Sequence, residues 1–148
     1  MESAADRMQT VKTLGALNEL LRITCRSLPA YLADARPWTQ SSDHGIQTAL
    51  DHLVADQQRY ARRLSDAITS CGGRPDPGRY AMEFTSKHDL ALDFLRHDVI
   101  CHQELDIAAI QRCAIDLEDM PQLHSLAEEI LGNAKGHLEV LKEMQKDE

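Results

Sequence analysis

Apolar residues recur at intervals of three and four positions along four long stretches of this chain. Because an α-helix turns once in about 3.6 residues, this spacing gives each stretch one apolar face. The stretches cover about 6–35, 43–70, 87–117 and 121–145 of the 148 residues. The apolar faces of the second and fourth consist of Ile46, Leu50, Leu53, Leu64 and Ile68, and of Leu123, Leu126, Ile130, Leu138 and Leu141. The pattern predicts an all-α, single-domain protein, spanning 1–148, in which four helices share one core.

Proline and glycine mark where these helices bend, begin and end. Pro29 lies inside the first apolar pattern, so we expect a kink there or the separation of the last turns. The second helix should stop at Cys71-Gly72-Gly73, with a glycine in the left-handed position that follows a helix end. Ser86 is a suitable N-cap for the third helix, and Pro121 fits the first turn of the fourth.

The connection between the second and third helices, residues 72–86, is long. It contains three glycines and two prolines, so it cannot continue the helix. Tyr80, Met82 and Phe84 alternate with other residues as in an extended segment that covers a surface. Fully extended, the connection reaches roughly 45–50 Å, while a helix of about 28 residues is roughly 42 Å long. We therefore predict a crossover that runs the length of the bundle and makes the second and third helices parallel, with a plain up-down-up-down bundle as the competing topology.

Composition and charge exclude several classes of function. The net charge is −8 and there is no basic run, so we expect no nucleic-acid partner. No apolar run is long enough to cross a membrane, and the first residues lack the pattern of a secretory signal. The four cysteines lie far apart without a C-x-x-C motif, which is typical of reduced thiols in a cytoplasmic protein. No phosphate-binding glycine loop or catalytic triad spacing is present, so we do not expect an enzyme.

Polar residues fall at mid-length on the inner faces of all four predicted helices. At about 100° per residue, Gln57 and Tyr60 lie within the apolar arc of the second helix. Thr24 lies at the same level of the first helix and Glu104 at that of the third. In the fourth helix, Ala134 and His137 share the face of Ile130 and Leu141.

This layout resembles the ferritin-like superfamily, the di-iron four-helix bundles that include bacterioferritins and rubrerythrins. In that family the first and third helices each contribute a Glu, and the second and fourth each contribute a Glu-x-x-His pair. The string "ADQQRYARRL" resembles the family's second helix, with Gln57 in place of Glu and Tyr60 in place of His. Thr24 stands where the first helix would supply its Glu.

The resemblance implies that two of the six metal-ligand positions are kept. Glu104 in "ELDIAAIQRCAI" corresponds to the Glu of the third helix, and His137 in "NAKGHLEVL" to the His of the fourth. Ala134 replaces the Glu of the fourth helix. A di-iron centre needs several carboxylates to bridge and neutralise two cations. We therefore expect a ferritin-like bundle that has lost di-iron chemistry, has no metal cofactor, and acts as a structural or interaction protein.

In place of a metal we predict a network of hydrogen bonds in the core. Glu104 would accept hydrogen bonds from the Tyr60 hydroxyl and the Gln57 amide, and His137 would pair with Glu104, because buried polar groups need partners. A small polar ligand held by the same side chains is a further option.

Two alternatives concern other residues. A single Fe, Zn or Mn ion could bind a remodelled site of His97, Cys101, Glu104 and His137, since His97 and Cys101 are spaced one helical turn apart.

Gly132 and Gly136 lie on one stripe of the fourth helix, roughly opposite its core face. That stripe predicts a close approach by the crossover or by another subunit, and a homodimer is the expected assembly.

Overall fold

The computed structural model describes residues 3–35, 44–89 and 92–146. These residues contain five α-helices and one 3-10 helix. They are α1 (Ala4–Cys25), α2 (Leu28–Ala35), α3 (His44–Ser70), η1 (Met82–Asp89), α4 (Leu92–Asp116) and α5 (Pro121–Lys146). Residue 43, at the predicted start of the second helix, lies outside the described residues.

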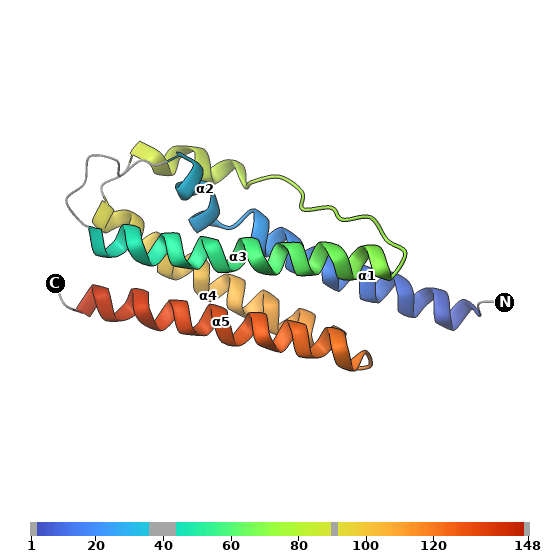
Figure 1. Ribbon diagram of the computed structural model, residues 1–148. Coiled ribbons are helices and arrows are strands. Elements are labelled where there is room, and N and C mark those ends of the chain that lie inside the picture. Colours follow the sequence, from blue (N-terminus) through green and yellow to red (C-terminus); the bar gives the residue numbers. More distant parts are fainter. Residues whose placement is uncertain (1–2, 36–43, 90–91, 147–148) are drawn as a thin grey trace.

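Four rods of helix lie side by side, and the first rod consists of α1 followed by the short α2 (Figure 1). α1 and α2 separate at Arg26 and Ser27, just before Pro29, as predicted. Ser27 caps the start of α2 at this break, because its hydroxyl accepts a hydrogen bond from the backbone N–H of Ala30 at 3.1 Å. This contact satisfies one of the free donors at the start of α2.

The long crossover between α3 and α4 is confirmed. From the end of α3 the chain runs back along the bundle, so α3 and α4 are parallel while α5 is antiparallel to both (Figure 1). α3 ends at Ser70, and the turn that follows contains Gly72, whose φ of 83° requires the left-handed conformation that glycine adopts without strain. The crossover is tied to α1, because Asn18 accepts a hydrogen bond from Asp76 N at 2.8 Å and Arg26 Nε donates to Gly78 O at 2.9 Å.

The last part of the crossover is not extended as predicted. Residues 82–89 form η1, and α4 begins at Leu92 rather than near 87, so Ser86 lies inside the 3-10 helix. Phe84 is the residue that seals the bundle: it is 5% exposed and its ring centroid lies 5.9 Å from that of Tyr31. Met82 points outward and is 88% exposed. A 3-10 turn breaks the strict alternation of an extended chain, which explains this difference.

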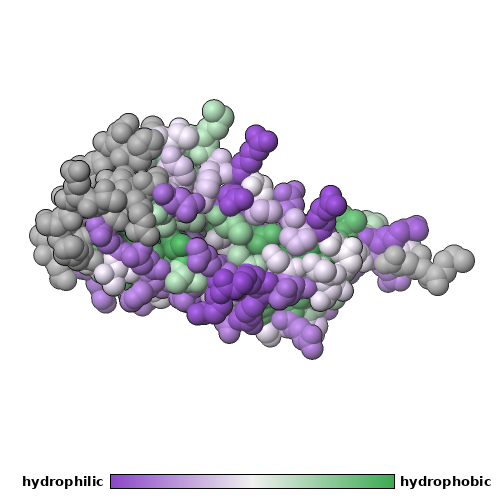
Figure 2. Space-filling model, turned by 45° about the horizontal axis from the view of Figure 1, so that its top comes forward, coloured by the Kyte–Doolittle hydropathy of each residue, from purple (hydrophilic) through white to green (hydrophobic). Residues whose placement is uncertain are grey.

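The core consists of two apolar clusters, one at each end of the bundle. One cluster joins α1 to the second half of α3 and includes Leu17, Leu64 and Leu117. The other joins α2 to the first half of α3 and includes Leu32 and Leu50. On the face shown in Figure 2, hydrophobic side chains are seen mainly between hydrophilic ones. None of the described helices is long and apolar enough to cross a lipid bilayer.

Candidate functional site

Polar side chains form a layer between the two apolar clusters, at the middle of the bundle. They surround a cavity of about 20 Å³, which is room for about one water molecule. The cavity is lined by Ile23, Thr24, Leu53, Gln57, Tyr60, Gln103, Asp106, Ile110, Ile130, Asn133, Ala134 and His137. A small polar ligand in the bundle core would need considerably more room than this.

Five of the six residues predicted at ferritin ligand positions meet at this cavity. They are Thr24, Gln57, Tyr60, Ala134 and His137. Glu104 does not join them, and its prediction was wrong. Its side chain is 53% exposed, and its carboxylate lies 4.0 Å from Lys142 Nζ on the outside of the bundle. The adjacent Gln103 occupies the inner position of α4 and is 2% exposed.

The hydrogen bonds at the cavity therefore differ from the predicted network around Glu104. The Thr24 hydroxyl lies 3.1 Å from both Leu20 O and Leu21 O and donates within its own helix. Ser27 donates its hydroxyl hydrogen to Gln57 Oε1 at 2.9 Å. Ser27 thus caps α2 and also holds Gln57, a role that the sequence pattern did not suggest.

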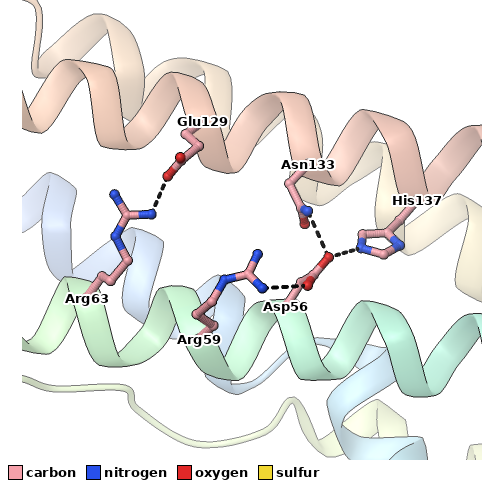
Figure 3. A network of polar contacts seen from close by, with 6 residues as sticks. All are labelled: Asp56, Arg59, Arg63, Glu129, Asn133 and His137. Atoms are coloured by element: carbon pink, nitrogen blue, oxygen red, sulfur yellow. Dashed lines mark hydrogen bonds and ion pairs between the residues drawn. The ribbon is translucent and has the colours of Figure 1, made fainter.

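Tyr60, which the resemblance placed at the position of a ligand histidine, lines the cavity. It is 5% exposed and belongs to the apolar cluster on the α1 side. The guanidinium groups of Arg59 and Arg63 lie 5.2 and 5.6 Å from the centroid of its ring. Arg63 also forms an ion pair with Glu129, which links α3 to α5 (Figure 3). The phenol ring therefore packs as a core residue beneath a charged surface.

His137 pairs with Asp56 across the interface between α3 and α5 (Figure 3). Its Nε2 lies 2.7 Å from Asp56 Oδ2, and Asn133 Nδ2 donates to the same oxygen at 2.8 Å. Arg59 forms an ion pair with the other carboxylate oxygen at 3.2 Å. Partial burial acts to raise the pKa of Asp56, but the hydrogen bonds from Asn133 and His137, with the nearby positive charges, outweigh it and lower this pKa. The imidazole is thus held by a carboxylate outside the six ligand positions.

Gln103 and Asp106 bring unsatisfied polar atoms to the cavity. Gln103 Nε2 donates to Ala134 O at 3.1 Å, but Gln103 Oε1 and Asp106 Oδ2 have no hydrogen-bond partner among the described residues. Burial raises the pKa of Asp106 to about 7. A single water in the cavity would satisfy such groups. Sequence reasoning missed both residues, although Val99, Gln103, Asp106, Ile110 and Leu117 fall on one face of a helix.

The alternative set of metal ligands is not brought together. His97 and Cys101 are exposed on the outer face of α4, where Cys101 Sγ lies 3.8 Å from His97 Nε2. Glu104 follows on the same outer side, whereas His137 lies inside with Asp56. Within residues 3–35, 44–89 and 92–146, no three His, Cys, Asp or Glu side chains are grouped so that they could hold a metal ion. All four cysteines are free thiols, and Cys113 is the buried one.

No family model matches this chain, and no curated protein sequence matches it. A solved structure does. The chain superposes on the X-ray structure of Desulfovibrio desulfuricans bacterioferritin, which shows that protein's diiron site in different catalytic states. The TM-score is 0.75 with 16% sequence identity, and the match covers 93% of this chain and 80% of the bacterioferritin chain. The chain has the ferritin-like fold.

The ferritin-like fold explains why the polar layer lies at mid-bundle. In di-iron bundles of this fold the metal ligands project inward from all four helices at one level. In this chain the polar cavity at mid-bundle is lined by Thr24, Gln57, Tyr60, Gln103, Asp106, Ala134 and His137, among others. These side chains include one imidazole, His137, and one carboxyl group, Asp106, which is fewer carboxylates than a di-iron centre needs.

Proposed function

We propose that this chain is a ferritin-like bundle that has lost di-iron chemistry and acts as a structural or interaction protein. The observation that carries this proposal is the lining of the central cavity. Two ferrous ions bring a charge of +4, which bridging carboxylates must balance. Asp106 lines the cavity but its pKa is raised to about 7, and Asp56, which contacts the lining, is engaged by His137 and Asn133.

Hydrogen bonds and packing take over the structural role of metal ligands in this proposal. Asp56 with His137 joins α3 to α5, and Ser27 with Gln57 joins the α1–α2 break to α3. Without these pairs, apolar contacts alone would set the register of the linked helices. These two pairs favour one register over others, because a shifted helix would leave their polar groups buried without partners.

Metal analysis of the purified chain tests the proposal. Protein purified without chelator should contain well below one equivalent of iron, zinc or manganese. Added Fe²⁺ should leave the urea midpoint unchanged, because a ligand that binds only the folded state would raise it. Stoichiometric metal that is lost in His137→Ala, but retained in the surface variant His52→Ala, would overturn the proposal.

A single metal ion is the second candidate, and the proximity of His97 and Cys101 favours it. Their 3.8 Å separation places two ligand-type side chains on one exposed turn of α4. Two ligands from one helix leave a Zn, Fe or Mn site incomplete, so solvent or a second chain would have to supply the rest. Metal that is lost in His97→Ala and retained in His137→Ala would identify this site.

We further propose that the protein is a cytoplasmic homodimer. Light scattering after size-exclusion chromatography should give twice the monomer mass of 16.6 kDa. A mass that stays at the monomer value over the micromolar range would contradict the dimer.

A further inference from the structure

A second pocket, which shares Ile23 and Asp106 with the lining of the central cavity, lies between α1, α4 and the crossover. Its volume is about 330 Å³, at the lower end of the range for sites that bind small molecules. Four arginines line it: Arg22 from α1, Arg26 from the link to α2, Arg79 from the crossover and Arg112 from α4. Because the whole chain carries a net charge of −8, four arginines around one pocket form a local reversal of charge.

The arginines of this pocket differ in how far they are already engaged. Arg22 forms an ion pair with Glu19 of the same helix. Arg26 Nε donates to Gly78 O at 2.9 Å, which fixes the crossover beside the pocket. Arg79 and Arg112 are exposed, and neither has a hydrogen-bond or ion-pair partner among the described residues. Two guanidinium groups from different elements are therefore free to bind an anion.

Two carboxylates also line the pocket, and they do not cancel its positive charge. Glu19 is engaged by Arg22. Burial raises the pKa of Asp106 to about 7, so this carboxyl group is partly protonated at neutral pH. His102, whose Nε2 lies 4.0 Å from Glu83 Oε1, adds a further side chain that becomes positive when protonated. Arg26, Arg79 and Arg112 each contribute one positive charge, and Asp106 can cancel at most one of them. The pocket therefore has an excess of at least two positive charges.

The wall beside these arginines is apolar. Ile23, Leu28 and Phe84 line the same pocket and are at most 7% exposed. A free inorganic anion would leave this wall unused, whereas an organic group attached to the anion could pack against it. The guanidinium fork matches the oxygens of phosphate and carboxylate groups. A phosphate monoester carries about −1.5 to −2 charges at pH 7, which balances the excess better than one carboxylate does.

From this arrangement we propose that the pocket binds a small organic phosphate. Its phosphate group lies between Arg79 and Arg112, with Arg26 nearby, and its organic part lies against Phe84 and Leu28. None of these five contacting residues lines the central cavity, so this site stands whether or not the chain binds metal.

Calorimetric titration of the full chain at 150 mM NaCl and pH 7 tests the proposal, with phenyl phosphate as the probe. Phenyl phosphate should bind at least tenfold more tightly than inorganic phosphate, because only the ester uses the apolar wall. It should also bind at least tenfold more tightly than benzoate, which offers the ring with a single carboxylate. Equal affinity for inorganic phosphate, or tighter binding of benzoate, would overturn the assignment.

Variants locate the site. Arg79→Ala and Arg112→Ala should each weaken phenyl phosphate binding at least tenfold without changing the melting temperature, since both side chains are exposed and without described partners. Arg62→Ala removes the same charge from an exposed position of α3 outside the pocket and should leave the affinity within twofold. The proposal is overturned if wild-type protein does not bind the probe at millimolar concentration, or if Arg62→Ala weakens binding as much as the pocket variants do.

Discussion

Replacing Asp56 by Ala removes the carboxylate that joins α3 to α5 at the middle of the bundle. The residue accepts hydrogen bonds from His137 at 2.7 Å and from Asn133 at 2.8 Å. Its loss would leave both donors partly buried without this acceptor. We expect Asp56→Ala to destabilise the fold, although alanine is the better helix former.

The magnitude follows from the two hydrogen bonds and their exposure. A buried hydrogen bond to a charged group contributes about 1.5–3 kcal/mol. The side chains of Asp56 and His137 are 23% and 17% exposed, which favours the low end of that range. We expect a loss of about 2–3 kcal/mol on unfolding free energy for Asp56→Ala. In a double-mutant cycle with His137→Ala, the coupling energy should be about 1–2 kcal/mol.

Urea unfolding followed by circular dichroism at 222 nm measures these quantities. Asp66→Ala is the matched control, because Asp66 is exposed on the same helix and has no described partner. Subtracting the stability change of Asp66→Ala from that of Asp56→Ala removes the stabilisation that alanine brings as the better helix former. A coupling energy below about 0.3 kcal/mol, within the error of additivity, would refute the assigned role of this pair.

The same pair should respond to acid. Because the pKa of Asp56 is lowered in the folded chain, its contribution is present above the unfolded pKa of about 3.9. It is lost as the pH falls through the lower folded pKa. The difference in stability between wild type and Asp56→Ala should therefore shrink below about pH 4, and a difference that stayed constant down to pH 2 would contradict this account.

Three further predictions use the same unfolding assay. Burial raises the pKa of Asp106 from 3.8 to about 7, so the cost of ionising this carboxyl group in the folded chain grows as the pH rises between these values. Asp106→Asn should therefore stabilise the chain at pH 8 by up to about 4 kcal/mol, and by less at pH 5. Ser27→Ala should cost about 1.5–2.5 kcal/mol, because it removes both the cap of α2 and the bond to Gln57; a loss below 0.5 kcal/mol would contradict these roles. A Cβ at Gly132 or Gly136 would meet nothing within 4 Å, so alanine at each should stabilise the chain by about 0.8–1 kcal/mol. If the alanine variants are instead destabilised and elute as monomers where the wild type elutes as a dimer, these glycines lie in a subunit interface.

The glycines of this chain differ in whether another segment packs against them, although their local sequence does not show this difference. Gly132 and Gly136 were predicted to allow close approach, yet within the described residues their surroundings are open. Gly73 is the glycine that a neighbour approaches closely: a Cβ there would lie 2.5 Å from Leu14 Cδ2. Spacing on a helix identifies small residues, but only the packed chain shows which of them meets another segment.

The sequence by itself determined the four long helices and favoured the crossover topology, but it did not indicate η1. Helix periodicity is a local property, so the faces of α3 and α5 could be identified from Leu50, Leu64 and Leu141. The break at Pro29 and the stop at Gly72 follow from backbone chemistry at single residues. The crossover followed from length, since 72–86 can span a helix and cannot form one. The likeness to the ferritin-like superfamily rested on these features together with the polar positions at mid-length, and it is confirmed as a fold.

Only the tertiary structure decided which side of α4 faces inward. Leu105 and Ile115 are apolar yet 66% and 56% exposed, so the apolar arc of this helix was too broad to choose one face. Neighbouring residues on a helix point about 100° apart, and choosing Glu104 instead of Gln103 turned the predicted inner face by that angle. The rotation of α4 is set by its contacts with α1 and α5, which involve residues far away in the chain. For the same reason the pairing of Asp56 with His137, and the presence of Arg79 and Arg112 in the lining of one pocket, could not be predicted from local spacing.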